Sequence, residues 1–195
     1  MNRVFVLGNG ISRRQVNLNH LQAYGPVYGC NALYREFTPA VLVATDRPIA
    51  TQIQESGYSA KNTFYTRKPL DKLGAQRIPH DYHGCSSGPA AVGIAAHNGA
   101  RNVYLLGFDL GGTQDHRFNN VYADTEFYKT SDAKPTFSGN WVRQLCKIIK
   151  NHPKIKFVRV VGNTTAAVLE FDSFANFSRC DLRWFQDCIN NQKDL

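Results

Sequence analysis

Five polar side chains closely follow short apolar runs of this chain, a position from which they could bind a ligand together. They are Asn9, Asn31, Asp46, Asp109 and Asn163. If the runs are parallel strands, their carboxyl ends meet at one edge of a sheet, where open α/β sheets bind ligands. Each residue alone is better explained as a turn or capping residue. Five of them at strand exits favour a site.

The turn Gly8-Asn9-Gly10 is the first candidate for binding a phosphate. Glycines let the backbone approach an anion, and a helix after the turn would offer free N–H groups and its positive end. We expect Ser12 to cap that helix. A dinucleotide fingerprint needs a third glycine where Arg13 stands, and an acid for the ribose where Asn31 stands. The pattern therefore argues against NAD and FAD.

A second turn, Ser86-Ser87-Gly88, has the same chemistry. It precedes Pro89, a residue suited to the first helical position, and a helix expected over Ala90 to Asn98. Two hydroxyls and free N–H groups could hold a phosphate or a carboxylate. Simple capping of the helix is an equal alternative.

The same segment formally matches the G-x-S-x-G motif of serine hydrolases over Gly84–Gly88. That motif requires a strand directly before it. The preceding residues 78–83 contain Pro79 and several polar residues and make a poor strand, so we do not favour a hydrolase. Cys85, near a helix start, could have a lowered pKa, although the sequence specifies no partner for it.

Three ionisable residues are candidates for catalysis or for holding a metal. Asp109 follows a strongly apolar run and is the strongest acid candidate, and His116 could act as a general acid or base. For a lone loop histidine, simple exposure to solvent is the favoured alternative. Asp46 and Asp109 could hold Mg²⁺ against a phosphate or bind sugar hydroxyls.

Apolar runs alternate with helical patterns along nearly the whole chain. Strands are expected at residues 3–7, 26–30, 40–45, 62–66, 103–106 and 155–161, the fourth at an edge. Residues 67–84 are expected to form a mobile flap, residues 111–135 a binding loop, and the chain from 164 to 188 a helical cover. This alternation predicts one α/β domain over residues 1–195, a Rossmann-like open parallel sheet with helices on both faces.

Composition narrows the function classes. The net charge of +8 comes from scattered Lys and Arg residues, which makes nucleic acid an unlikely partner and suits an acidic small molecule. No apolar stretch reaches the length of a membrane span, so we expect a cytoplasmic protein. Five cysteines without C-x-x-C spacing favour reduced thiols over a disulfide framework or zinc site. The oligomeric state is left open, with a homo-oligomer as one alternative.

Several segments resemble the bacterial family 42 sialyltransferases. Val4–Ser12 resembles the start of that family around its "GNGPS" motif, and Cys30–Tyr34 is similar to its second-strand "CNxxY". Ser87-Gly88 and Val103–Asp109 look like its "SG…GxxxIYLxGID". The last strand and the turn Gly162–Thr164 look like its "PNS" turn. A second resemblance, around Gly107–Leu110 and His116, is to hydroxymethylpterin pyrophosphokinase-like domains.

The first resemblance implies a CMP-sugar donor bound by Asn9, Asn31, Ser87 and Gly88. The chain also departs from that family. Phe137 stands where the family has its catalytic histidine. Gly111 and Arg117 stand where it has two tyrosines that hold the donor phosphate, and Ile11 replaces the proline of "GNGPS".

Together these observations predict a nucleotide-binding transferase that moves a glycosyl or phosphoryl group from a nucleotide donor to an unknown acceptor. Two alternatives remain: a protein that binds or sequesters a nucleotide without turnover, and a basic nucleic-acid-binding domain. The predicted roles are donor binding and catalysis. Donor binding is assigned to Gly8, Asn9, Gly10, Asn31, Asp46, Ser86, Ser87 and Gly88, and catalysis to Asp109 and His116.

Overall fold

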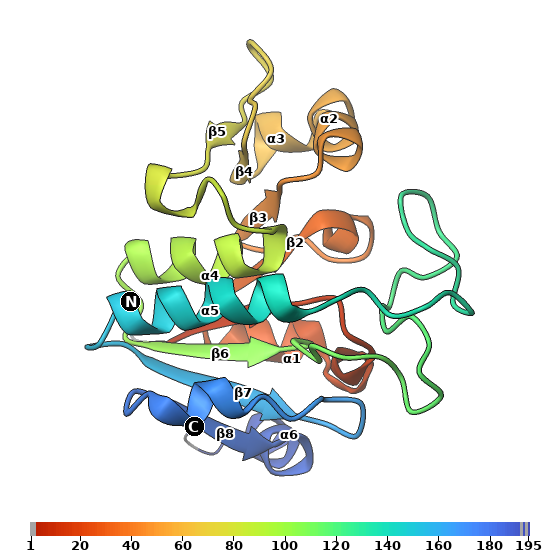
Figure 1. Ribbon diagram of the computed structural model, residues 1–195. Helices are drawn as coiled ribbons and strands as arrows, with labels where there is room; N and C mark the ends of the chain where they lie inside the picture. The colour runs from red at the N-terminus through yellow and green to blue at the C-terminus, as the bar shows by residue number, and fades with distance from the viewer. Residues whose placement is uncertain (1–2, 192, 194) are drawn as a thin grey trace.

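The computed structural model describes residues 3–191, 193 and 195, and its centre is one sheet of parallel strands. The strand order is β5-β4-β3-β2-β1-β6-β7-β8 (Figure 1). All seven strand pairings are parallel. The strands are β1 Arg3–Leu7, β2 Val27–Cys30, β3 Val41–Ala44, β4 Phe64–Thr66, β5 Gln76–Arg77, β6 Asn102–Leu106, β7 Lys156–Val161 and β8 Phe177–Asp181. The predicted α/β class with a Rossmann-like parallel sheet is confirmed.

Apolar side chains fill both faces of the sheet, because successive residues of a strand point to opposite sides. In β1, Val4 and Val6 belong to one core cluster, while Phe5 and Leu7 belong to the other. All four are fully buried. Burial on both faces explains why the central strands read as continuous apolar runs.

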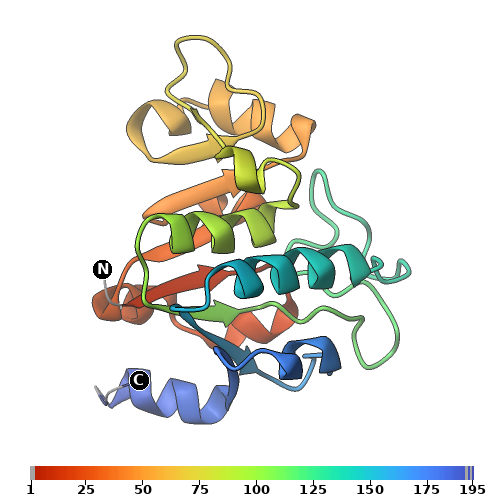
Figure 2. The ribbon, with the colours of Figure 1, turned by 60° about the vertical axis from the view of Figure 1, so that its left-hand side comes forward.

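Helices cover both faces (Figures 1 and 2). On one face α4 (Ser87–His97) and α5 (Gly139–Asn151) lie side by side, and they supply much of the first core cluster. The opposite face is covered by α1 (Leu18–Tyr24), α2 (Arg47–Glu55) and α6 (Leu182–Asn190). Shorter pieces are α3 (Tyr58–Lys61) and the 3₁₀ turns η1 Ile11–Gln15, η2 Asn31–Arg35, η3 His80–Tyr82 and η4 Leu169–Ser173.

The strand order reverses at β1, and this reversal positions the functional site. From β1 the chain adds strands outward to β5, and then returns through α4 to place β6 on the other side of β1. On the two sides of this reversal, the connections leave toward opposite faces of the sheet, which opens a crevice at the carboxyl ends of the strands. Crevices of this kind at the carboxyl ends of strands are where open α/β sheets bind ligands.

Several local predictions are corrected by the structure. The turn after β1 leads into the 3₁₀ turn η1, and the first α-helix begins only at Leu18, capped by the Asn17 side chain. Ser12 therefore does not cap a helix. Pro89 is the third residue of α4, since that helix begins at Ser87. β4 is not the edge strand, because the two-residue β5 pairs with it.

The C-terminal part differs most from expectation. We predicted a helical cover there, but Phe177–Asp181 forms β8, which pairs in parallel with β7, and only Leu182–Asn190 is α-helical. Residues 107–138 contain no helix or strand, as expected for a long loop. Within the described residues, no helix has the length and apolar character needed to cross a membrane.

Candidate functional site

A cavity of about 330 Å³ lies at the carboxyl edge of the sheet, around the reversal at β1. This volume is at the lower end of the range for small-molecule sites. Its walls come from the ends of β1, β2, β3, β4 and β6, the first turn of α4, the start of α5 and the long loop. They include Gly8, Asn9, Gly10, Cys30, Asn31, Thr45, Asp46, Arg67, Ser86, Ser87, Gly88, Phe108, Asp109, Asn119, Asn120 and Trp141.

All eight residues predicted to bind the donor line this one cavity. The two turns that the sequence suggested, around Gly10 and Gly88, thus meet although 78 positions separate them in the chain. Of the five strand-exit residues, Asn9, Asn31, Asp46 and Asp109 line the cavity and Asn163 does not. Neither does His116, which is exposed on the long loop.

The backbone of the first turn has a structural task. The N–H of Gly8 donates to the carbonyl of Leu106 at 2.7 Å, and the N–H of Gly10 donates to the carbonyl of Gly107 at 2.8 Å. These two amides, which we expected to face an anion, are therefore already used. They join the chain after β1 to the chain after β6.

Close approach explains why glycines stand in this turn. A Cβ on Gly8 would lie 2.5 Å from the Gly107 carbonyl oxygen, and one on Gly10 would lie 2.7 Å from the same atom and overlap the Asp109 carboxylate. Gly107 itself has a φ of +68°, which disfavours any other residue. These glycines let two loops touch.

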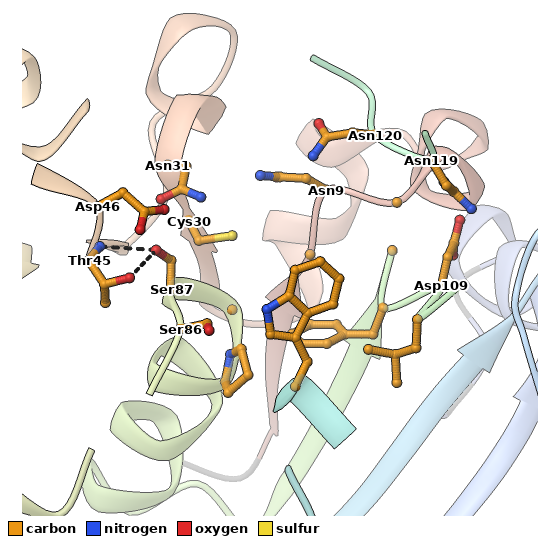
Figure 3. Close-up of a pocket in the computed structure, with 18 of the residues that line it drawn as sticks. Asn9, Cys30, Asn31, Thr45, Asp46, Ser86, Ser87, Asp109, Asn119 and Asn120 are labelled. Carbon is orange, nitrogen blue, oxygen red and sulfur yellow. Dashed lines mark hydrogen bonds between the residues drawn. The ribbon is translucent and has the colours of Figure 1, made fainter. Parts of the chain in front are cut away.

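Two asparagine side chains of the cavity wall contain a buried polar atom without a hydrogen-bond partner among the residues that the structure describes. The amide oxygens of Asn9 and Asn31 are buried and accept no hydrogen bond from the described residues. A buried polar atom without a partner is costly, and most such atoms in folded proteins are paired. In Figure 3, both side chains extend into the cavity. Asn31 has a φ of +53°, a conformation that asparagine tolerates better than most residues.

The first turn of α4 can offer backbone N–H groups to a ligand, whereas its Ser87 hydroxyl is already hydrogen-bonded within the protein. The Ser87 hydroxyl binds the Thr45 N–H at 3.0 Å and the Thr45 hydroxyl at 2.9 Å (Figure 3). The Ser86 N–H donates to the Gln144 side chain at 2.9 Å. The N–H groups of Ser87 and Gly88 have no acceptor within the described part of the chain, as is usual for the first positions of a helix. They stay available to an anion.

The Asp109 carboxylate is surrounded by donors from the protein itself. It accepts from the Ser12 N–H at 3.1 Å, from the Ser12 hydroxyl, from the Thr164 hydroxyl at 2.7 Å and from the Thr165 hydroxyl at 3.3 Å. Only 3% of the residue is exposed. This geometry favours a role in joining the loops after β1, β6 and β7 over a role in proton transfer.

A buried arginine, Arg159, binds the backbone of the loop that contains Asp109. Arg159 is 1% exposed, and its guanidinium donates to the carbonyls of Phe108, Asp109 and Ala166 at 2.8–3.0 Å. Burial lowers the pKa of Arg159 to about 10. Arg159 thus shapes the cavity wall after β6 without lining the cavity.

Burial disfavours the thiolate form of Cys30, which lines the cavity, and of Cys85, which lies just before α4. Burial raises the pKa of Cys30 to about 12, and burial also raises the pKa of Cys85. The prediction of a lowered Cys85 pKa was therefore wrong: desolvation outweighs the nearby Lys147 and Arg67 charges. The residues before Ser86 form η3 and turns rather than a strand, which removes the basis for a hydrolase motif.

Metal binding finds little support in the geometry. Among the described residues, no group of three or more His, Cys, Asp or Glu side chains is arranged to hold a metal ion. Asp46 and Asp109 both line the cavity, but the Asp109 oxygens already face Ser12, Thr164 and Thr165.

Sequence reasoning did not single out several residues of the cavity wall, among them Arg67 and Trp141, whereas Asn119 and Asn120 belong to the predicted binding loop 111–135. Arg67 directly follows β4, so the strand-exit argument would have included it. Asn119 connects the long loop to the first turn, since its amide oxygen accepts from the Ile11 N–H at 2.8 Å. No local signal marks Asn120 or Trp141, because only the path of the loop and of α5 brings them to the cavity.

Comparison with known proteins shows the fold. No protein-family model matches the sequence, and no curated protein matches it. Structures of the sialyltransferase CstII do match. One, from Campylobacter jejuni in complex with the substrate analogue cytidine 5′-monophosphate, has a TM-score of 0.54 at 14% identity over 82% of this chain and 79% of that chain.

A second CstII structure from Campylobacter jejuni, in complex with CMP-3FNeuAc, has a TM-score of 0.51 at 16% identity over 82% of this chain and 80% of that chain. A third, with trisaccharide acceptor and CMP, has a TM-score of 0.50 at 13% identity over 90% and 93% of the two chains. The resemblance to pyrophosphokinase-like domains receives no support from these comparisons. The chain has a sialyltransferase-like fold.

Proposed function

We propose that this protein is a nucleotide-binding transferase that moves a glycosyl group from a nucleotide-sugar donor of the CMP type. The observation that carries the proposal is the cavity at the strand reversal, which is lined by Asn9 and Asn31, two side chains whose buried amide oxygens have no partner among the described residues. The fold supports it, because matching structures of CstII hold CMP or a CMP-linked analogue.

The proposed binding roles follow from which groups are free. The amide oxygens of Asn9 and Asn31 would accept hydrogen bonds from N–H or O–H groups of the nucleotide or its sugar. The N–H groups of Ser87 and Gly88 would bind an anionic group of the donor at the positive end of α4. Gly8 and Gly10 contribute by letting the loops meet, and Ser86 and the Ser87 hydroxyl by anchoring α4.

A thermal-shift panel of CMP, CDP, UDP, GDP and ATP, each with and without Mg²⁺, tests the binding step. We expect CMP and CDP to raise the unfolding temperature, because a ligand that binds only the folded state stabilises it. Little dependence on Mg²⁺ is expected, since Asp109 is occupied by protein donors. If none of the five nucleotides stabilises the protein, the proposal is wrong.

A second candidate, a protein that sequesters a nucleotide without turnover, is favoured by three features of the same region. Asp109 is already bound by Ser12 and two threonines, and His116 lies off the cavity wall. Phe137, which replaces the histidine expected from the sialyltransferase resemblance, is 77% exposed.

Turnover separates the two candidates. Incubation with CMP-N-acetylneuraminic acid, followed by chromatography of the nucleotides, should show release of CMP by a transferase, slowly even without an acceptor. A sequestering protein binds the donor and leaves it intact. The predicted catalytic roles of Asp109 and His116 belong to the first candidate and are tested by the same assay on Asp109→Asn and His116→Ala variants.

A further inference from the structure

Two oppositely charged side chains, Asp46 and Arg67, line the part of the cavity at the carboxyl ends of β3 and β4. Asp46 follows β3 and Arg67 follows β4. Among the described residues, neither side chain forms an ion pair within 4 Å, either with the other or with any third residue. A carboxylate and a guanidinium are therefore present in one cavity without neutralising each other.

Contacts with the backbone hold Arg67 beside the first turn of α4. Its Nε donates to the His83 carbonyl at 3.0 Å, and its Nη2 donates to the Cys85 carbonyl at 2.8 Å. These carbonyls belong to two of the three residues before Ser86, the capping residue of α4. The guanidinium thus adds positive charge near the free N–H groups of Ser87 and Gly88, and this side of the cavity suits an anion.

Asp46 lies beside another hydrogen-bond acceptor, the amide group of Asn31. The preceding residue, Thr45, is tied to the Ser87 hydroxyl, which places the end of β3 against α4. In Figure 3 the Asp46 carboxylate lies beside the Asn31 amide, whose buried oxygen accepts no hydrogen bond. Asp46 stands at the capping position of α2 but makes no capping bond. This side of the cavity therefore offers acceptors that suit a cationic donor.

We propose that this end of the cavity holds a zwitterionic group, with its carboxylate against Arg67 and the α4 amides and its ammonium against Asp46 and Asn31. The inference rests on the proposed function, because it assigns the zwitterionic group to the sugar that the nucleotide carries. It makes Asp46 and Arg67 the residues that determine specificity for that part.

Four related sugars that differ in which of these charges they carry provide the test. Muramic acid carries a carboxylate and an amine, N-acetylmuramic acid only the carboxylate, glucosamine only the amine, and glucose neither. Dissociation constants are measured by NMR titration, with and without saturating CMP. We expect muramic acid to bind at least about tenfold more tightly than the others, the factor expected for one charged hydrogen bond.

Variants assign each charge to its residue. Asp46→Asn should remove the preference for muramic acid over N-acetylmuramic acid, and Arg67→Met the preference over glucosamine. Arg67→Lys, which keeps the charge, should retain a preference. Asp71→Asn and Lys68→Met make the same charge changes at exposed residues outside the cavity wall and should leave all four constants unchanged.

The outcomes also separate this inference from the proposed function. If CMP binds but the four sugars bind equally or not at all, the zwitterion inference is overturned and nucleotide binding stands. The zwitterion inference is overturned as well if Asp46→Asn weakens the binding of all four sugars alike. If CMP fails to bind while muramic acid keeps its preference, the cavity recognises a zwitterion and the nucleotide assignment falls.

Discussion

At the scale of single residues, Asp109 shows how a carboxylate at a strand exit can be used by the fold. Its two oxygens accept from the Ser12 N–H, the Ser12 hydroxyl and the hydroxyls of Thr164 and Thr165. These donors come from segments about 100 positions before it and about 55 after it. The carboxylate therefore joins three loops around the cavity.

We expect Asp109→Asn to lower the free energy of unfolding by about 3 kcal/mol, because an amide loses charged hydrogen bonds and turns its NH₂ group toward donors. Urea denaturation measures the change. Asp115→Asn, at an exposed position of the long loop, is the control and should change the free energy by less than about 0.5 kcal/mol. A variant as stable as the parent protein but without turnover would show that Asp109 is catalytic instead.

Asn9 is the opposite case, because its buried amide oxygen has no partner in the protein. Asn9→Ala should weaken CMP binding about tenfold, the factor for one good hydrogen bond. It should leave the unfolding temperature of the free protein unchanged or slightly higher. Calorimetric titration and thermal unfolding measure the two quantities. Equal CMP affinity in both proteins would remove Asn9 from the site.

At the scale of elements, the two turns that line the cavity use glycine for different reasons. A Cβ on Gly10 would overlap the Asp109 carboxylate, whereas one on Gly88 would meet only the Phe108 ring, at an ordinary 3.4 Å. The first glycine therefore serves packing between loops. The second leaves the start of α4 open toward the cavity.

The matched substitutions should separate stability from binding. Gly10→Ala is expected to lower the free energy of unfolding by roughly 2 kcal/mol through overpacking. Gly88→Ala should leave stability unchanged or slightly raised, since alanine suits a helix better than glycine, while it weakens CMP binding several-fold by crowding the α4 amides. Thermal unfolding and calorimetric titration of both variants test this. Destabilisation by Gly88→Ala without loss of affinity would contradict the assignment of α4.

At the scale of the whole molecule, the C-terminal strand and helix complete the sheet. β8 extends the sheet beyond β7, and α6 closes the face opposite α4 and α5. Phe185 of α6 is fully buried, with its ring centroid 6.1 Å from that of Phe5 and 6.0 Å from that of Tyr104. The last part of the chain thus packs on the two strands that flank the cavity.

Phe185→Ala should therefore lower the free energy of unfolding by about 3–5 kcal/mol, the usual cost of removing a buried aromatic ring. Chemical denaturation gives the value, and circular dichroism checks that the variant is folded. Trp184→Ala removes a larger ring that is 50% exposed, and it serves as the control with a much smaller expected loss. Similar losses for both would mean that α6 does not close the core.

Local pattern alone determined the class of fold and most of its strands. Central parallel strands are buried on both faces, so β1, β3 and β6 appear as uninterrupted apolar runs, and polar residues follow where each strand leaves the core. β8 was not predicted because it lacks this burial on both faces. As an edge strand with mostly exposed or half-buried side chains, Phe177–Asp181 carries no apolar run, and its pairing with β7 is tertiary.

Sequence patterns also indicated which residues would leave the strands together, and the predicted donor-binding residues do line one cavity. Which of their groups remain free depends on contacts between distant parts of the chain. The amides of Gly8 and Gly10 and the carboxylate of Asp109 are used by partners that lie far away in the chain, while the oxygens of Asn9 and Asn31 are left without any. Spacing along a chain determines where a side chain emerges, but a hydrogen bond depends on which distant loop meets it in space.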